Sequence, residues 1–310
     1  MPRSASSASG SDDEGLGALL EEPEGFRPPT PPPTVRNYKR RKYGGVGERA
    51  GDEQVEVGLV SGHPLWGHIL YPAAIAMARF LELHASSLLH GPEGRGKGKG
   101  KAVLELGAGG GLPGLVAALE GAGQVVISDF PDAALVKNLE KNVETNVTAL
   151  SNPDVAQTRA VGFTWGAPPT PLFETLDPPS RKFDLVLLSD LVFNHSQHLA
   201  LLNTCLSCLA SPSAAPLPSS SAAPPQRPSV DLAPEVLSTP AVLCFFSHHR
   251  PKFVDADLQI LELARAHGWE VTKVWEDKDA GPAFPEDEDR LGQPEIRGTV
   301  HGWMFTRPPA

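Results

Sequence analysis

The feature that most constrains the fold is a glycine-rich turn at residues 107–114, which directly follows the apolar run 102–106. An apolar run of this length is typical of a strand buried on both faces of a parallel sheet. Glycine accepts positive φ and has no Cβ, so the backbone can turn sharply beneath a ligand. Leu112, Leu115 and Leu119 then recur at helical spacing. Strand, glycine turn and helix open a doubly wound α/β domain, in which ligands bind at the carboxyl ends of the strands.

The glycines fit two classes of ligand. Gly109, Gly111 and Gly114 match the dinucleotide-binding fingerprint, and Asp129 follows at a distance suited to a ribose. The strand itself ends earlier, and from its end the pattern is Glu-Leu-Gly-Ala-Gly, in which the charge of Glu105 would repel a pyrophosphate. S-adenosylmethionine instead carries a sulfonium and an ammonium group. We therefore favour S-adenosylmethionine as the cofactor, with a nicotinamide coenzyme as the alternative.

Composition excludes several other classes of protein. The net charge of −10 argues against broad binding to nucleic acid, which needs a basic surface. No apolar run approaches the ~20 residues that a membrane-spanning helix needs. The first residues lack the hydrophobic region of a secretory signal. We therefore expect a cytoplasmic protein that binds neither nucleic acid nor membrane. We also expect a monomer, although none of these features determines the oligomeric state.

The chain is expected to form one domain with an arm and two low-complexity segments. Residues 1–33 are polar, acidic and then proline-rich, so they cannot bury enough apolar surface to fold. We assign residues 34–310 to the domain. Within it, residues 91–101 alternate Gly with Lys or Arg and predict a flexible loop. The Ser/Pro/Ala-rich residues 211–239 predict a disordered insertion.

Hydrophobic patterning predicts a small N-terminal hairpin followed by a large sheet. The hairpin falls within residues 38–60, where apolar residues alternate. The expected strands of the sheet are 102–106, 124–128, 160–163, 183–188, 241–246, 270–275 and 299–306. Helical patterns separate most of them, but none lies between the last two. Two final strands without a helix between them favour an antiparallel edge on an otherwise parallel sheet.

Because parallel strands align their carboxyl ends, Gly107, Asp129, Trp165 and Asp190 should line one edge of the sheet. For Asp129 we favour contact with ribose hydroxyls, although a cap on the next helix is the alternative. Trp66 and Trp165 lie beside glycines, which favours loops and a wall for a ligand, although ordinary packing is the more frequent role of a Trp. The histidines 63, 68, 195, 248 and 249 show no metal-ligand spacing, and we expect them to orient loops, with an isolated catalytic histidine as the alternative.

A second informative stretch follows the fourth strand and reads Ser-Asp-Leu-Val-Phe-Asn-His at residues 189–195. Asp190-x-x-Phe193 resembles the Asp-x-x-Tyr/Phe motif of the protein-lysine methyltransferase group. Together with residues 26–33, 62–67 and 247–251, the stretch resembles one subgroup within it. That subgroup is the fungal elongation factor 1-alpha N-terminal and lysine methyltransferases, formerly labelled nicotinamide N-methyltransferases. The likeness covers most of residues 21–310, apart from the predicted loop and insertion.

The resemblance implies a Rossmann-like, seven-stranded methyltransferase sheet and a protein substrate, the N-terminus of elongation factor 1-alpha. It implies a substrate amine near Asp190 and Phe193, which we expect to be the catalytic residues. The residues that it implies for S-adenosylmethionine are Trp66, Gly107, Ala108, Gly109, Asp129, Trp165 and Ser189. Other classes remain open: a small-molecule N-methyltransferase of the nicotinamide type, an NAD-binding oxidoreductase, or a non-catalytic module that binds through the proline-rich arm.

Overall fold

The computed structural model describes residues 32–41, 54–61, 68–150, 152, 154–179, 181–212, 237, 240–284 and 292–307. Almost all of the predicted arm, most of the predicted insertion and the segment that carries Trp66 lie outside these residues. The predictions made for them therefore stay predictions. Within the described residues, no helix is both long enough and apolar enough to cross a membrane.

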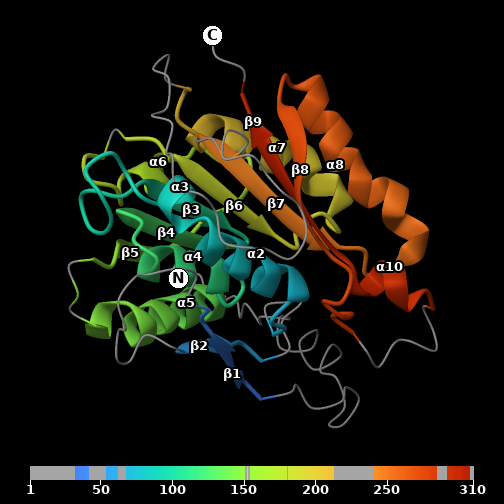
Figure 1. The fold of residues 1–310 in the computed structure, drawn as a ribbon, viewed down its shortest axis with the longest axis horizontal. Helices are drawn as coiled ribbons and strands as arrows, with labels where there is room; N and C mark the ends of the chain where they lie inside the picture. The colour runs from blue at the N-terminus through green and yellow to red at the C-terminus, as the bar shows by residue number, and fades with distance from the viewer. Residues whose placement is uncertain are drawn as a thin grey trace, which may run out of the picture.

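A seven-stranded sheet forms the centre of the molecule (Figure 1). Its order is β5-β4-β3-β6-β7-β9-β8. The first five strands in this order, from β5 to β7, run parallel to one another. Strand β9 runs antiparallel to both of its neighbours, β7 and β8. The predicted fold class is thereby confirmed. The strands are β3 Ala102–Leu106, β4 Gln124–Asp129, β5 Gln157–Gly162, β6 Leu185–Ser189, β7 Ala241–Ser247, β8 Glu270–Asp277 and β9 Val300–Thr306.

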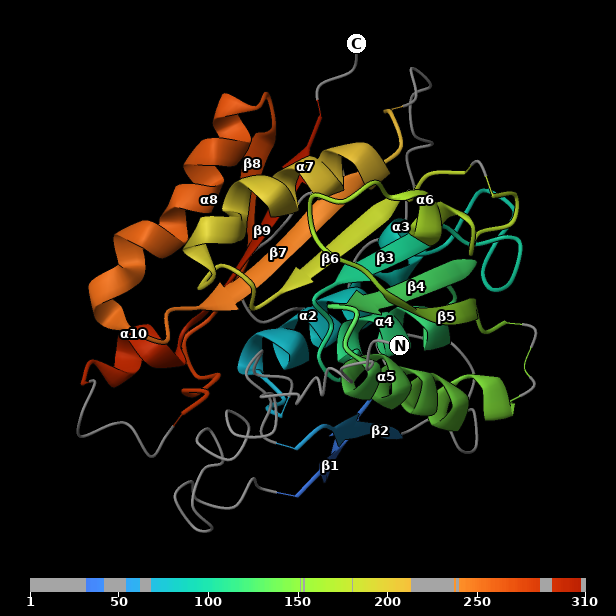
Figure 2. The same cartoon turned by 180° about the vertical axis from the view of Figure 1, so that it is seen from behind.

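Helices cover both faces of the sheet, as the two opposite views show (Figures 1 and 2). Side chains alternate along each strand, so Val103 joins the core on one face and Leu104 the core on the other. The first face is covered by α2 Pro72–Leu83, α3 Ala85–Leu88, α4 Leu112–Leu119 and α5 Ala133–Asn146. The second face is covered by α6 Thr170–Phe173, α7 His198–Cys208 and α8 Val254–Ala266. Short 3₁₀ turns occur at η1 Thr148–Leu150, η2 His195–Gln197 and η4 Pro251–Phe253.

The predicted N-terminal hairpin is present as β1 Thr34–Lys39 and β2 Gln54–Leu59, paired antiparallel. The alternating side chains of Val55, Val57 and Leu59 are buried in the core of the first face. Strand β2 lies against the glycine turn, because a Cβ on Gly110 would stand 2.4 Å from Val57. The hairpin therefore supports the turn from outside the large sheet.

Several details of the sequence prediction need correction. Strand β1 begins at Thr34, four residues before the predicted hairpin, because its first residues are exposed and show no apolar alternation. Strand β6 begins at Leu185, two residues after its predicted start. Strand β5 begins at Gln157, three residues before the apolar run that marked it, because this edge strand starts with polar residues. A short helix, α10 Pro294–Gly298, precedes β9, where no helical stretch was expected. Its five residues are too few to show a helical period.

Backbone hydrogen bonds hold the glycine-rich segment 91–101 both internally and to the turn after α4. The N–H of Gly91 donates to the carbonyl of Gly94, and the N–H of Gly96 donates to the carbonyl of Gly121. The flexibility expected for this segment stays a prediction.

Candidate active site

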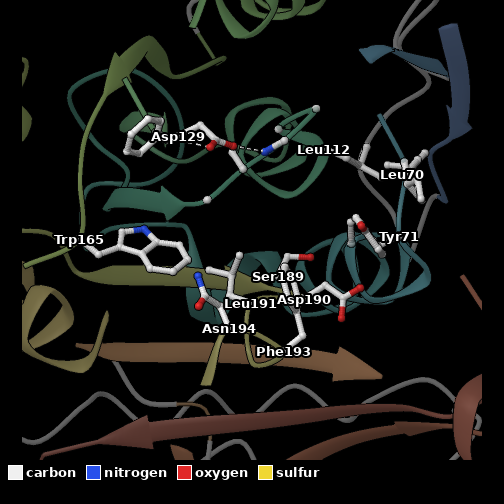
Figure 3. Close-up of a pocket in the computed structure, with 18 of the residues that line it drawn as sticks. Leu70, Tyr71, Leu112, Asp129, Trp165, Ser189, Asp190, Leu191, Phe193 and Asn194 are labelled. Carbon is white, nitrogen blue, oxygen red and sulfur yellow. Dashed lines mark hydrogen bonds between the residues drawn. The ribbon is translucent and has the colours of Figure 1, made fainter. Parts of the chain in front are cut away.

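A cavity of about 610 Å³ opens at the carboxyl ends of β3, β4 and β6 (Figure 3). Eight of the nine predicted site residues lie within the described part of the chain, and all eight line this cavity. They are Gly107, Ala108, Gly109, Asp129, Trp165, Ser189, Asp190 and Phe193. The ninth, Trp66, lies outside the described residues. The topology therefore brings together side chains that are far apart in the sequence.

The glycine turn forms the floor of the cavity, and a side chain at Gly107 would not fit there. Gly107 has φ +60°, and a Cβ there would lie 2.7 Å from Leu191 and 2.9 Å from Trp165. Gly109 also has positive φ, and its N–H donates to Asp129 Oδ2 over 2.6 Å. Apart from the methyl group of Ala108, this part of the turn is bare backbone, which allows close approach of a ligand.

Glu105 lies behind this turn and does not face the cavity. It is fully buried, and its Oε2 accepts a hydrogen bond from the Gly114 N–H at the start of α4. Burial raises the pKa of Glu105 to about 8, and the nearby charge of Asp129 adds to this. Glu105 is therefore protonated at neutral pH. The expectation that its charge selects the ligand is wrong, and its role is to join β3 to α4.

One end of the cavity combines a carboxylate with aromatic rings. Asp129 ends β4, and Phe130, Phe163 and Trp165 line the space around it. Asp129 Oδ1 accepts from the Phe130 N–H over 2.7 Å. This end offers hydrogen-bond acceptors beside flat apolar surfaces.

The opposite end is built around Asp190, the residue after β6 (Figure 3). Asp190 is 3% exposed, and its backbone takes φ 59°, a left-handed conformation that is unusual for any residue but glycine. Its Oδ2 lies 2.9 Å from Nε2 of His249, and the Ser247 N–H donates to Oδ1 over 3.4 Å. A strained backbone at a buried carboxylate is typical of functional sites.

Aromatic rings flank Asp190. Tyr71 lies just before α2, with its ring centroid 5.5 Å from that of His249, and Phe193 lies 6.5 Å from the same ring. Burial, and then the charge of Asp190, raise the pKa of the Tyr71 hydroxyl, so it stays protonated. Phe193 is 39% exposed, which places it at the mouth of the cavity.

Sequence reasoning missed Tyr71 and His249 as members of this end of the site. Tyr71 directly precedes Pro72, a residue that opens a helix, and this was the one available signal. His249 stands in the run Ser247-His248-His249, but nothing in the sequence indicates that it pairs with Asp190.

Two of the remaining histidines hold the loop that follows β6. His195 Nε2 and His248 Nδ1 lie 2.7 and 2.8 Å from the two carboxylate oxygens of Asp257 on α8. The shared carboxylate ties the end of β7 to η2, as expected for histidines that orient loops. In the described ranges, no group of three or more metal-ligating side chains occurs.

The residues present fit S-adenosylmethionine. Among the described residues that line the cavity, none is lysine, arginine or histidine, whereas carboxylates lie at both ends. Such a lining suits a cofactor with positive charge and disfavours a pyrophosphate. The buried Ser189 Oγ has no hydrogen-bond partner within the described residues, so it is available to a ligand.

Comparison with known proteins gives consistent relatives. Residues 61–219 match the model of a family described as lysine methyltransferase. A protein N-terminal and lysine N-methyltransferase of Schizosaccharomyces pombe, efm7, is 35% identical over 96% of this chain and 97% of its own length. The protein of the same name, EFM7, from Eremothecium gossypii is 37% identical over 94% of this chain and 95% of its own length. EFM7 from Cryptococcus neoformans is 39% identical over 80% of this chain and 74% of its own length.

Identity at this level over nearly the whole chain extends well beyond the glycine turn, which many unrelated enzymes share. The chain is an S-adenosylmethionine-dependent methyltransferase and belongs to the lysine methyltransferase family, within its group of protein N-terminal and lysine N-methyltransferases.

Proposed function

We propose that this enzyme methylates the N-terminal α-amine and the adjacent lysine of translation elongation factor 1-alpha. The observation that carries the proposal is the buried Asp190 carboxylate, which lies at the end of the cavity opposite Asp129 (Figure 3). A carboxylate there suits a cationic amine. The names of the relatives, which refer to a protein N-terminus and to lysine, point to the same two acceptors.

Each part of the cofactor is assigned to residues that line the cavity. The backbone of residues 107–109 would approach the methionine part, and Asp129 would accept both ribose hydroxyls. Trp165 would form a wall against the adenine, and Ser189 would donate its unpartnered hydroxyl. Trp66 is assigned to the same cofactor from the sequence resemblance alone. When bound, S-adenosylmethionine supplies a methyl group on a positively charged sulfur, which is already activated for transfer.

The residues near Asp190 then have to present a neutral amine in line with that methyl group. Orientation of this kind can supply up to about 7–11 kcal/mol. An α-amine with a pKa near ~7.7–8 is roughly one-tenth neutral at pH 7, whereas a lysine near ~10.4 costs about 3.5 kcal/mol more to deprotonate. The protein N-terminus is therefore the easier acceptor. Asp190 binds and orients the incoming ammonium, Phe193 packs on it by a cation–π contact, and the proton leaves to water.

A peptide assay tests this assignment. The enzyme is supplied with labelled methyl donor and a peptide of the elongation factor N-terminus, and mass spectrometry locates the label. Label on the α-amine and the next lysine is the expected result, and an acetylated N-terminus should remove the first. Label that appears on free nicotinamide and not on the peptide would replace the proposal with a small-molecule methyltransferase.

The role of Asp190 is tested by Asp190→Asn, which keeps the side-chain volume and tolerates the left-handed backbone. Loss of a hydrogen bond to a charged group, worth ~1.5–3 kcal/mol, should lower kcat/KM on the peptide about 10- to 100-fold. S-adenosylhomocysteine affinity should stay close to that of the parent enzyme, which shows that the variant is folded. Full turnover by Asp190→Asn would refute the assignment. The cytoplasmic location and the monomeric state stay predictions of the sequence.

A further inference from the structure

The carboxylate proposed to bind the substrate amine already has a titratable partner. His249 Nε2 lies 2.9 Å from Asp190 Oδ2, and the two side chains are 12% and 2% exposed. A carboxylate can only accept a hydrogen bond, so Nε2 carries a hydrogen and a second proton would add at Nδ1. Nδ1 has no hydrogen-bond partner among the described residues. His249 can therefore be neutral or cationic without losing its bond to Asp190.

Residues from five parts of the fold surround His249. Tyr71 from the start of α2 and Phe284 from the segment after β8 face its ring, at 5.5 and 5.4 Å between centroids. Besides Asp190, two charged groups act on it, Asp257 on α8 and Arg297 on α10. Asp257 is itself engaged by His248 and His195, which leaves Asp190 as the carboxylate that directly bonds His249.

These groups act on the pKa of His249 in opposite directions. Burial lowers it, whereas the charge of Asp190, the hydrogen bond to Asp190 and the charge of Asp257 raise it, and Arg297 lowers it again. The carboxylates prevail, so the pKa of His249 lies above its ordinary value. Its change of charge therefore occurs at a higher pH than that of an exposed histidine.

We propose that His249 is a positioning residue that decides whether Asp190 can receive the substrate amine. Neutral His249 orients the carboxylate and leaves its negative charge available to the incoming ammonium. Protonated His249 neutralises that charge and places a cation against the site, so the ammonium is repelled. This inference rests on the proposed function, because it assumes that the methyl acceptor is an amine.

The inference predicts a specific pH profile. Both the free substrate amine and His249 must lose a proton, so below both pKa values log kcat/KM should rise with a slope of about two per pH unit. His249→Gln keeps a side-chain N–H donor but cannot titrate, so its slope should fall to about one. A role in folding alone would lower the rate without changing the slope. His267→Gln, at an exposed position beyond α8, is the control and should keep a slope of about two.

A second measurement does not depend on the substrate. The imidazole of His249 is followed by NMR across pH in the parent enzyme and in Asp190→Asn, and its pKa should fall in the variant. A parent slope of one, an unchanged slope in His249→Gln, or an unchanged pKa in Asp190→Asn would each overturn the inference. If the peptide is not methylated at any pH, the proposed function fails, and the NMR titration alone then decides whether Asp190 and His249 act as one charged pair.

Discussion

At the scale of single residues, Asp190 is a buried carboxylate whose backbone takes a left-handed conformation. Its φ of 59° is held by the hydrogen bond from its own N–H to the Phe245 carbonyl on β7, 2.7 Å long. Asp and Asn tolerate this conformation better than most residues, because a short polar side chain can bond locally. The conformation therefore restricts which side chains this position accepts.

Glu105 is the second residue with an unusual environment, and it predicts how stability depends on pH. Its pKa is raised to about 8 in the folded protein, above the value of an exposed carboxyl, so the folded state holds a proton that the unfolded state has lost. The contribution of Glu105 to the free energy of unfolding is complete below the pKa that this carboxyl has in the unfolded chain. As the pH rises from there to the pKa in the folded protein, the contribution falls by up to about 1.4 kcal/mol per pH unit.

Glu105→Gln removes this titration and keeps an acceptor for the Gly114 N–H. Between pH 5 and 8, the free energy of unfolding of the parent enzyme should fall relative to that of Glu105→Gln, as measured by urea denaturation. Glu174→Gln, at a largely exposed position after α6, is the control and should follow the parent. A constant difference between parent and Glu105→Gln across this range would show that Glu105 is ionised in the folded protein.

The sequence predicted those residues of the site that end strands. Gly107, Asp129 and Asp190 each stand at or just after the carboxyl end of a strand, and parallel pairing is enough to align them. Tyr71 and His249 could not be found in this way. Their positions depend on how α2 packs over the sheet and on how the segment after β7 bends, and neither has a local pattern.

At the scale of elements, prediction succeeded where hydrophobicity marks both ends of a segment. Strand β3 is apolar apart from Glu105 and was predicted with its exact bounds. Strand β5 was predicted with its start too late, because an edge strand buries few side chains and its first residues are polar. Tertiary pairing with β4, which sets the true start, leaves no trace in the hydrophobic pattern.

The sequence also did not show that the hairpin contacts α5. Asn138, Asn142 and Asn146 lie one turn apart on α5 and bond the backbone of β2. Asn142 Nδ2 donates to the carbonyls of Gly58 and Gly110, and its Oδ1 accepts from the Gly58 N–H. One carboxamide therefore joins α5, the hairpin and the glycine turn.

Asn142→Ala should destabilise the protein more than Asn138→Ala. Asn142 is buried and makes three hydrogen bonds to backbone, so its loss leaves buried groups unmet and should cost ~1–3 kcal/mol. Asn138 is half-buried and donates one bond to the Gly58 carbonyl, which Asn142 also serves. Urea unfolding of both variants measures the difference. Equal losses would show that the hairpin is held by its apolar side chains and not by these amides.

At the scale of the whole molecule, the cavity joins parts of the chain that the sheet alone does not hold together. Its lining runs from Ile69 before α2 to Gln197 before α7, and includes the glycine turn and the ends of β4 and β6. A ligand that contacts all of these segments binds the folded state only. Its binding free energy therefore adds to the stability of the entire domain.

S-adenosylhomocysteine, the demethylated product, should accordingly raise the melting temperature. At 100 times its Kd it contributes about 2.7 kcal/mol, which corresponds to roughly 5–10 °C for a domain of this size. NAD should give no shift, because the described residues that line the cavity carry acids and no base to meet a pyrophosphate. Differential scanning calorimetry with each ligand measures both results.

Asp129→Ala and Asp132→Ala separate ligand binding from folding within one loop. Asp129 lines the cavity, so its loss should weaken the ligand by ~1–3 kcal/mol and remove most of the shift. Asp132 caps α5 by accepting from the N–H groups of Ala134 and Leu135, so its loss should cost about 1 kcal/mol of stability and lower the melting temperature of the protein without ligand. The shift caused by the ligand should then be unchanged. An undiminished shift in Asp129→Ala would rule out the ribose contact, because the ligand would then stabilise the folded protein equally well without the Asp129 carboxylate.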